Sequence, residues 1–129
     1  MWVRSIYIFL IGHSSDGDYN SMLKIIKTYR FNYHQAVNDN HLVANTDITF
    51  TSYPGVIAST DDFYLAHGKH SRIIVSGIKL KYNQSTQVHA IDIDAAVLMS
   101  VRVMAANRLA HNGKSWSRVM ARDPDIGAK

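Results

Sequence analysis

The sequence of 129 residues contains no cysteine, only two prolines and only seven glycines. The absence of cysteine excludes disulfide bonds, zinc ribbons and thiol chemistry within the chain itself. The scarcity of proline and glycine argues against a low-complexity linker. With 47% hydrophobic and 19% charged residues, the composition is that of one globular domain or a piece of one.

The sequence also lacks an apolar run long enough to cross a bilayer, which needs about 20 residues. Residues 1–12 carry one positive charge and then a short apolar run. A secretory signal is disfavoured, because Gly12-His13 does not provide a small-residue cleavage site. Isoleucine, tyrosine and phenylalanine favour extended backbone, so a buried strand is expected over Ile6 to Ile11.

No strong excess of one charge is present: 14 Lys and Arg face 10 Asp and Glu, for a formal net charge of +4. Lys24, Lys27 and Arg30 are spaced as the solvated side of a helix would be. No arginine–aromatic interleaving of the kind that binds single strands is visible. A small basic nucleic-acid-binding domain therefore rests on charge alone, and we expect no nucleic-acid partner.

Hydrophobic periodicity predicts a first helix over residues 19–30, capped by Asp18. A polar loop is expected over residues 32–47. Alternation and the turn residues Pro54-Gly55 and Asp61-Asp62 then predict extended segments, with a bulge or close backbone approach at Gly77. The expected strands cover residues 47–53, 63–65 and 72–82.

From about Asp94 the apolar spacing becomes helical, with Asp92 or Asp94 as the N-cap and Asn112-Gly113 as the end. Ser115 is expected to cap a short second helix that ends before Asp123-Pro124. This order of strands and helices favours an α+β fold for residues 1–129. The broad apolar face of the longer helix consists of Val97, Leu98, Val101, Met104, Ala105 and Leu109.

Two residue patterns suggest hydrolytic chemistry but are weak. Asp61 and Asp62 resemble paired carboxylates for acid–base work, but adjacent residues on an extended chain point to opposite sides. A turn before a strand is the preferred interpretation. A serine hydrolase built on His13 and Ser15 is disfavoured, because no strained glycine elbow surrounds the serine.

Metal binding and cofactors are not expected. His67 and His70 stand three residues apart in a glycine-containing loop without an accompanying carboxylate pattern. His89 and His111 are not spaced from the other histidines as metal ligands usually are.

Three segments in a fixed order carry a family resemblance. Residues 12–31 contain His-Ser-Ser-Asp followed by Met-Leu-Lys-Ile-Ile-Lys, residues 50–64 contain Ser-Tyr-Pro-Gly and then Asp-Asp-Phe-Tyr, and residues 101–116 end in Gly-Lys-Ser-Trp. They resemble His-x-x-Trp with its helix, Ser-Ser-Tyr-Pro-Gly … Asp-Asp-Phe-Tyr, and helix–Gly-x-x-Trp of the phospholipase B-like family. These proteins are N-terminal nucleophile hydrolases, and their members are several times longer.

The resemblance implies that residues 1–129 are the central part of a catalytic domain with a four-layer α-β-β-α sandwich. It also implies a nucleophilic cysteine, exposed by internal cleavage, whose α-amino group serves as the base. The chain has no cysteine, so this nucleophile is expected to be absent. We expect Tyr53, Phe63, Val101 and Trp116, which lie in or beside the matched segments, to share a core.

Individual positions follow the family pattern unevenly. His13 matches the histidine that lines the family's active site, where it could orient a substrate or donate to an oxyanion. Asp16 stands where the family has tryptophan, which puts substrate binding in doubt. The family's Glu-Thr-Thr segment, expected near Lys81–Ser85, has no match.

The leading hypothesis is an inactive fragment of a hydrolase that acts on lipid acyl-ester or N-acyl amide bonds. Its expected partners are a lipid or N-acyl small molecule and the remainder of the same domain. The family implies a lysosomal or secreted location, where the sequon Asn83-Gln-Ser would be a plausible glycosylation site. The alternative is a degenerate, non-catalytic interaction module.

Overall fold

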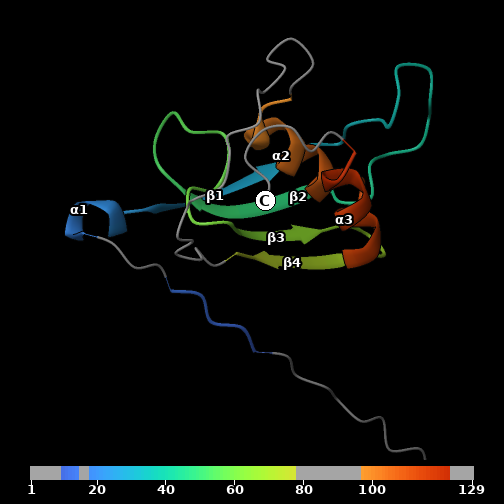
Figure 1. Ribbon diagram of the computed structural model, residues 1–129. Helices are drawn as coiled ribbons and strands as arrows, with labels where there is room; N and C mark the ends of the chain where they lie inside the picture. Colours follow the sequence, from blue (N-terminus) through green and yellow to red (C-terminus); the bar gives the residue numbers. More distant parts are fainter. Residues whose placement is uncertain (1–9, 15–17, 78–96, 123–129) are drawn as a thin grey trace, which may run out of the picture.

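The computed structural model describes residues 10–14, 18–77 and 97–122, and it has an α+β fold (Figure 1). A four-stranded antiparallel sheet in the order β1-β2-β3-β4 follows the chain order, and two helices cover one of its faces. The elements are α1 (Tyr19–Met22), β1 (Ile25–Arg30), β2 (Asp47–Ser52), β3 (Phe63–His67), β4 (Arg72–Ser76), α2 (Met99–Leu109) and α3 (Gly113–Met120).

Strand β2 shows why the sheet has two unlike faces. Ile48, Phe50 and Ser52 are fully buried, whereas Asp47, Thr49 and Thr51 are only half-buried. Successive side chains of a strand point to opposite faces, so the first set faces the helices and the second the open side. The open face continues across the sheet through the pairs Thr28↔Thr49, Thr49↔Leu65 and Leu65↔Ile74.

The hydrophobic core lies between the sheet and the two helices. Strand residues Phe50 and Tyr64 are its largest buried side chains, and Trp116 of α3 packs against its edge. Each such aromatic ring buries a large apolar area, and this burial favours folding. The buried core residues are Ile48, Phe50, Ala58, Tyr64, Ala66, Ile73, Val103 and Ala110.

The helix expected over residues 19–30 is wrong. Helix α1 ends at Met22, and residues 25–30 form strand β1, which pairs with β2 from Ile25↔Ser52 to Arg30↔Asp47. The β-branched residues of this segment favour extended backbone, and the pairing supplies backbone hydrogen bonds over its whole length. Ile26, which lies within the expected helix, is 77% exposed.

The expected apolar face of the long helix is mostly wrong, because Met104 alone of its residues packs against the core. Val101 is 48% exposed and Leu109 is 40% exposed, whereas Val103 and Ala106 are buried in the core. The polar side chain of Asn107 faces inward with them. Its Oδ1 accepts a hydrogen bond from Trp116 Nε1 at 2.8 Å, and this bond lowers the cost of burying an amide.

The shared core expected for Tyr53, Phe63, Val101 and Trp116 is wrong, since Trp116 alone of the four packs against the core.

The second helix is confirmed, with a different cap. Asn112, not Ser115, is its N-cap: Asn112 Oδ1 accepts from the Ser115 backbone N–H at 2.9 Å, and Ser115 Oγ accepts from the Asn112 N–H at 3.1 Å. This reciprocal pair is a capping box. The turn at Pro54-Gly55 is confirmed as well, with Gly55 at φ +81°.

Several sequence expectations concern residues that the structure does not describe. They are most of the strand over Ile6 to Ile11, the strand beyond Gly77, the caps Asp92 and Asp94, and the stop at Asp123-Pro124. Leu10 and Ile11 are not in a strand, and Leu10 is 87% exposed. Within residues 10–14, 18–77 and 97–122, no helix has the length and apolarity that crossing a membrane requires.

Candidate functional site

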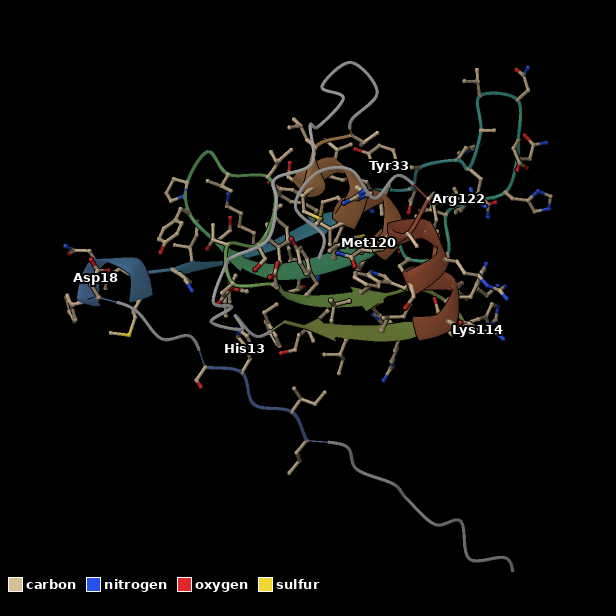
Figure 2. The ribbon with its side chains drawn as sticks, in the orientation of Figure 1. His13, Asp18, Tyr33, Lys114, Met120 and Arg122 are labelled. Atoms are coloured by element: carbon tan, nitrogen blue, oxygen red, sulfur yellow. The ribbon has the colours of Figure 1, made fainter. Side chains whose placement is uncertain are left out.

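His13 lies against the sheet on the β4 side (Figure 2). Its ring stacks on Phe63 with a centroid distance of 4.9 Å and an interplanar angle of 16°. Ring atom Nδ1 lies 2.9 Å from Ser76 Oγ, and Nε2 lies 3.3 Å from Asp61 Oδ2. The second distance is within the range of an ion pair, but His13 Nε2 and Asp61 Oδ2 do not form a hydrogen bond. The histidine side chain is only 11% exposed, so the cluster holds it in one orientation.

Asp61 is the centre of this cluster. Its Oδ1 accepts hydrogen bonds from the hydroxyls of Thr51 and Ser59, the latter at 2.8 Å. Its Oδ2 accepts from Lys24 Nζ at 2.9 Å. Burial raises the pKa of this carboxyl, but the hydrogen bonds from Thr51, Lys24 and Ser59 outweigh burial and lower the pKa to about 2. Asp61 is therefore ionised at any physiological pH.

The loop before β3 is shaped to present Asp61 to the cluster. Ser59 Oγ accepts from the Phe63 backbone N–H at 3.0 Å, and the Ser59 N–H donates to Tyr64 Oη at 2.8 Å. Burial raises the pKa of Tyr64 to about 12, so the phenol remains protonated. Tyr64 thereby anchors the loop to the core, and the loop places Asp61 beside His13.

Gly77 fixes the other side of the cluster. Its backbone N–H donates to the Asp62 carbonyl at 3.0 Å, and a Cβ at this position would lie 2.6 Å from Asp62 Cβ. Only glycine permits this approach, so the close backbone approach expected at Gly77 is confirmed. It brings Ser76, the last residue of β4, next to the loop that carries Asp61.

The structure brings together only some of the site residues that were predicted from the sequence. His13 and Asp61 are brought together, and Asp62 forms the expected turn with φ 54°. Asp16, Ser15 and Asn83 lie outside the described residues. Lys24, Thr51, Ser59 and Ser76 were not predicted, because no local pattern connects residues that meet only across the fold.

The described histidines that were weighed as metal ligands are all exposed: His67, His70 and His111. In the part of the chain that the structure describes, no three His, Cys, Asp or Glu side chains gather as a metal site would require. His89 lies outside that part.

A second polar cluster lies under the end of α2, around the fully buried Asn45. The Asn45 side-chain amide donates to the carbonyls of Asn107 and Ala110 at 2.8 and 2.7 Å, and its oxygen accepts from Ser71 at 2.5 Å. Carbonyls at a helix end need such partners. The hydrogen bonds of Asn45 all join buried groups of the protein, so this cluster stabilises the fold.

An open apolar groove of about 330 Å³ runs between β1 and α2. Arg108 closes one wall, with its guanidinium 5.3 Å from the Phe31 ring centroid and 5.0 Å from that of Tyr33. The remaining lining residues are Tyr29, Ile57, Val101, Met104 and Ala105.

Comparison with known proteins agrees with the resemblance noted in the sequence. A family model described as "Phospholipase B" matches residues 3–125. The "Putative phospholipase B-like lamina ancestor" of Drosophila melanogaster is 45% identical over 122 residues, which cover 93% of this chain and 18% of that protein. "Phospholipase B-like protein C" of Dictyostelium discoideum is 33% identical over 116 residues, covering 87% of this chain and 19% of that protein. "Phospholipase B-like 1" of Bos taurus is 32% identical over 110 residues, covering 85% and 18%.

The chain thus spans less than a fifth of the length of these relatives. The residues of the polar cluster, His13, Lys24, Asp61 and Ser76, all lie within the matched range. This chain belongs to the phospholipase B family.

Proposed function

We propose that the chain forms the central part of a phospholipase B-like hydrolase domain that acts on lipid acyl-ester or N-acyl amide bonds. The observation that carries this proposal is the cluster in which ionised Asp61 holds the His13 ring at the edge of the open sheet face. A buried histidine that is oriented by a carboxylate is a typical part of a hydrolytic site. No cofactor is needed for this chemistry.

The open face of the sheet supports a larger architecture. Leu65 and Ile74 lie in one row of this face and are 36% and 42% exposed. We propose that a second sheet of the same domain covers them in a four-layer α-β-β-α sandwich of the N-terminal nucleophile type. The partners of the chain are then the remainder of that domain and a lipid or N-acyl small molecule.

The nucleophile is the missing part. The 129 residues contain no cysteine, so the isolated chain has no thiolate to attack a carbonyl. We propose that the chain is inactive by itself and that His13 lines the site rather than attacks. A lysosomal or secreted location, with Asn83 glycosylated, belongs to the same proposal.

A non-catalytic interaction module is the second candidate, and the groove beside α2 favours it. Val101, Phe31 and Tyr33 are 48%, 42% and 51% exposed along that groove. A contiguous apolar surface of this kind is typical of a docking site. This candidate needs no reacting group at His13.

One experiment separates the two candidates. Residues 3–125 replace the matching segment in a full-length relative that hydrolyses an N-acyl or phospholipid probe, and the chimera is assayed beside the isolated chain. We expect turnover from the chimera and none from the chain above a heat-treated control. His13→Ala should lower the turnover of the chimera at least about tenfold, and Lys114→Ala, an exposed control in α3, should not.

Full activity of the His13→Ala chimera would contradict a role for this cluster in catalysis. Turnover by the isolated chain, lost in His13→Ala, would contradict the absence of a nucleophile. A chimera that folds and is secreted but does not hydrolyse the probe would favour the interaction module.

A further inference from the structure

The groove between β1 and α2 has apolar walls and one charged group. One wall is a row of aromatic rings, with centroids 5.6 Å apart between Tyr29 and Phe31 and 5.3 Å apart between Phe31 and Tyr33. The facing wall comes from α2 and consists of Val101, Met104 and Ala105. Among the described residues that line the groove, Arg108 alone carries a charge.

The guanidinium of Arg108 is buried without a carboxylate partner. Arg108 is 7% exposed, and no carboxylate in the described part of the chain lies within ion-pair distance of it. Asp47 acts on Arg108 only from farther away, and its own carboxylate pairs with Arg30 at 3.5 Å. Burial lowers the pKa of Arg108, because less water stabilises its charge. An anion in the groove would supply the missing stabilisation.

Part of the guanidinium remains available to such an anion. Both hydrogen bonds of this group come from Nη1, which donates to the Thr46 carbonyl at 3.0 Å and to the Asn45 carbonyl at 3.5 Å. Nε and Nη2 have no hydrogen-bond partner among the residues that the structure describes. Together they form one edge of the planar group, and such an edge binds both oxygens of a carboxylate. Stacking over Phe31 and Tyr33 holds the group in place.

We propose that the groove binds an amphiphile made of one apolar chain and one carboxylate. The carboxylate pairs with the Nε and Nη2 edge of Arg108, and the chain lies between the aromatic row and α2. A volume of about 330 Å³ is near the lower end for small-molecule sites, which fits a single chain of about eight carbons. A phosphate dianion fits less well, because its second charge would be desolvated without a second cation.

This binding site is separate from the site proposed for hydrolysis. No residue that lines the groove belongs to the cluster around Asp61. The inference therefore does not rest on the proposed hydrolase function, and either one can fail without the other.

Octanoate is the probe, and octan-1-ol is its uncharged counterpart. The full chain, labelled with ¹⁵N, is titrated with each at pH 7 below the concentration at which octanoate forms micelles, and the Val101 and Ala105 amide signals report the dissociation constants. We expect octanoate to bind with a Kd on the order of 1 mM and about tenfold more tightly than octan-1-ol, because charge-assisted hydrogen bonds to Arg108 are added. Hexanoate should bind about fourfold more weakly than octanoate, because it buries less apolar area.

Two variants separate the charge from the shape of the groove. Arg108→Gln removes the charge and should abolish the preference for octanoate over octan-1-ol. Because Arg108 also bonds to Thr46, a second variant leaves it in place: Ala105→Leu fills the groove from an exposed position of α2 and should weaken both ligands at least about tenfold. Ala121→Leu, the same exchange at an exposed position outside the groove, should change neither. Circular dichroism checks that each variant is folded.

The full-length chimera that carries residues 3–125 shows whether the groove stays open in an intact protein. We expect calorimetry to detect octanoate binding to the chimera, and Ala105→Leu to weaken it about tenfold. Binding that Ala105→Leu does not weaken would place octanoate elsewhere and overturn the inference. Equal affinity of the chain for octanoate and octan-1-ol would overturn it as well. No binding to a folded chimera would show that the remainder of the domain covers the groove, which would also overturn it.

Discussion

The Asn45 cluster and the Asp61 cluster are both polar, but the first is buried and the second only partly so, and they differ in charge and in access to solvent. Asn45 is a neutral amide at 0% exposure, and its bonds join Asn107, Ala110 and Ser71 into a closed set. Asp61 is ionised, and its cluster ends at the exposed Ser76 hydroxyl through His13. Burial of polar groups alone is thus no sign of function.

The side chains in each cluster can be related to the polar groups that need hydrogen-bond partners there. The carbonyls at the end of α2 require donors, and the Asn45 amide supplies two with no net charge. The partly buried carboxylate of Asp61 answers no such need of a helix end, since apolar packing is often equally stable at such a position. Asp61 instead joins Thr51, Ser59 and Lys24, and it lies beside the His13 ring.

Asn45→Ala should give the largest loss of stability. The change removes three hydrogen bonds and leaves two buried carbonyls without donors. We expect the free energy of unfolding to fall by about 3 kcal/mol and Tm by about 10 °C, measured by circular dichroism. Asn40→Ala, at an exposed loop position, should shift Tm by no more than about 2 °C. Equal effects of the two variants would show that the cluster around Asn45 is not structural.

Asp61→Asn should give a smaller loss that depends on pH. The folded-state pKa of Asp61 is about 2 against a reference of 3.8, so the unfolded chain binds its proton more readily. The stabilisation is fully present above about pH 4 and is lost as the pH falls toward 2, with a size of about 2 kcal/mol. Urea unfolding at pH 7 and pH 2.5 measures it.

Asp62→Asn is the matched control for this pH dependence, because Asp62 is exposed and asparagine also tolerates its positive φ. The control should lose stability on acidification as the parent does, and Asp61→Asn should lose about 2 kcal/mol less. Identical acid profiles for the parent and Asp61→Asn would show that the carboxylate is not held as described.

Arg108→Lys tests whether the planar guanidinium matters next to the Asn45 cluster. Arg108 Nη1 donates to the Thr46 carbonyl at 3.0 Å while the group stacks over Phe31 and Tyr33. Lysine keeps the charge but loses the planar stacking, so we expect a loss of about 1 kcal/mol by urea unfolding. Arg118→Lys on exposed α3 should change nothing measurable. A loss no greater than that of the control would contradict the stacking.

Val101→Thr should give the smallest effect on stability and a clear effect on surface properties. Val101 is 48% exposed in the groove, so the hydroxyl remains in water and stability should stay within about 0.5 kcal/mol. Fluorescence of a bound hydrophobic dye should decrease. Val103→Thr is the counterpart on the buried side of α2, at 7% exposure, and should cost about 1–2 kcal/mol. The reverse order would show that the sequence-based assignment of the buried face was right.

Local signals in the sequence were sufficient for strand β2, the Pro54-Gly55 turn and helix α3. The alternation in Asp47–Ser52 coincides with its burial, since one face of that strand is covered. The helix expected over residues 19–30 failed because residues 25–30 pair with β2, a partner that begins 17 residues after Arg30 and that no local pattern reveals. Tertiary pairing overrode the local pattern.

The candidate site could be predicted only in part, because its residues come from separate segments. His13 was found through a family motif and Asp61 as a turn residue, but their meeting depends on Lys24 before β1 and Ser76 at the end of β4. The buried side of α2 failed for a related reason. Asn107 turns inward to reach Trp116, and no hydrophobic pattern encodes such a polar contact.

The chain-ordered arrangement of the sheet has a kinetic consequence. Strands β3 and β4 are joined by residues 68–71 alone, so their pairing closes a short loop, whereas the His13–Ser76 contact spans 63 residues. Short-range pairings form early in folding and long-range ones late. The contact of His13 with Ser76 should therefore form after the transition state. In stopped-flow experiments, His13→Ala is expected to leave the refolding rate nearly unchanged and to accelerate unfolding, so that the contacts of His13 govern how long the chain stays folded rather than how fast it folds.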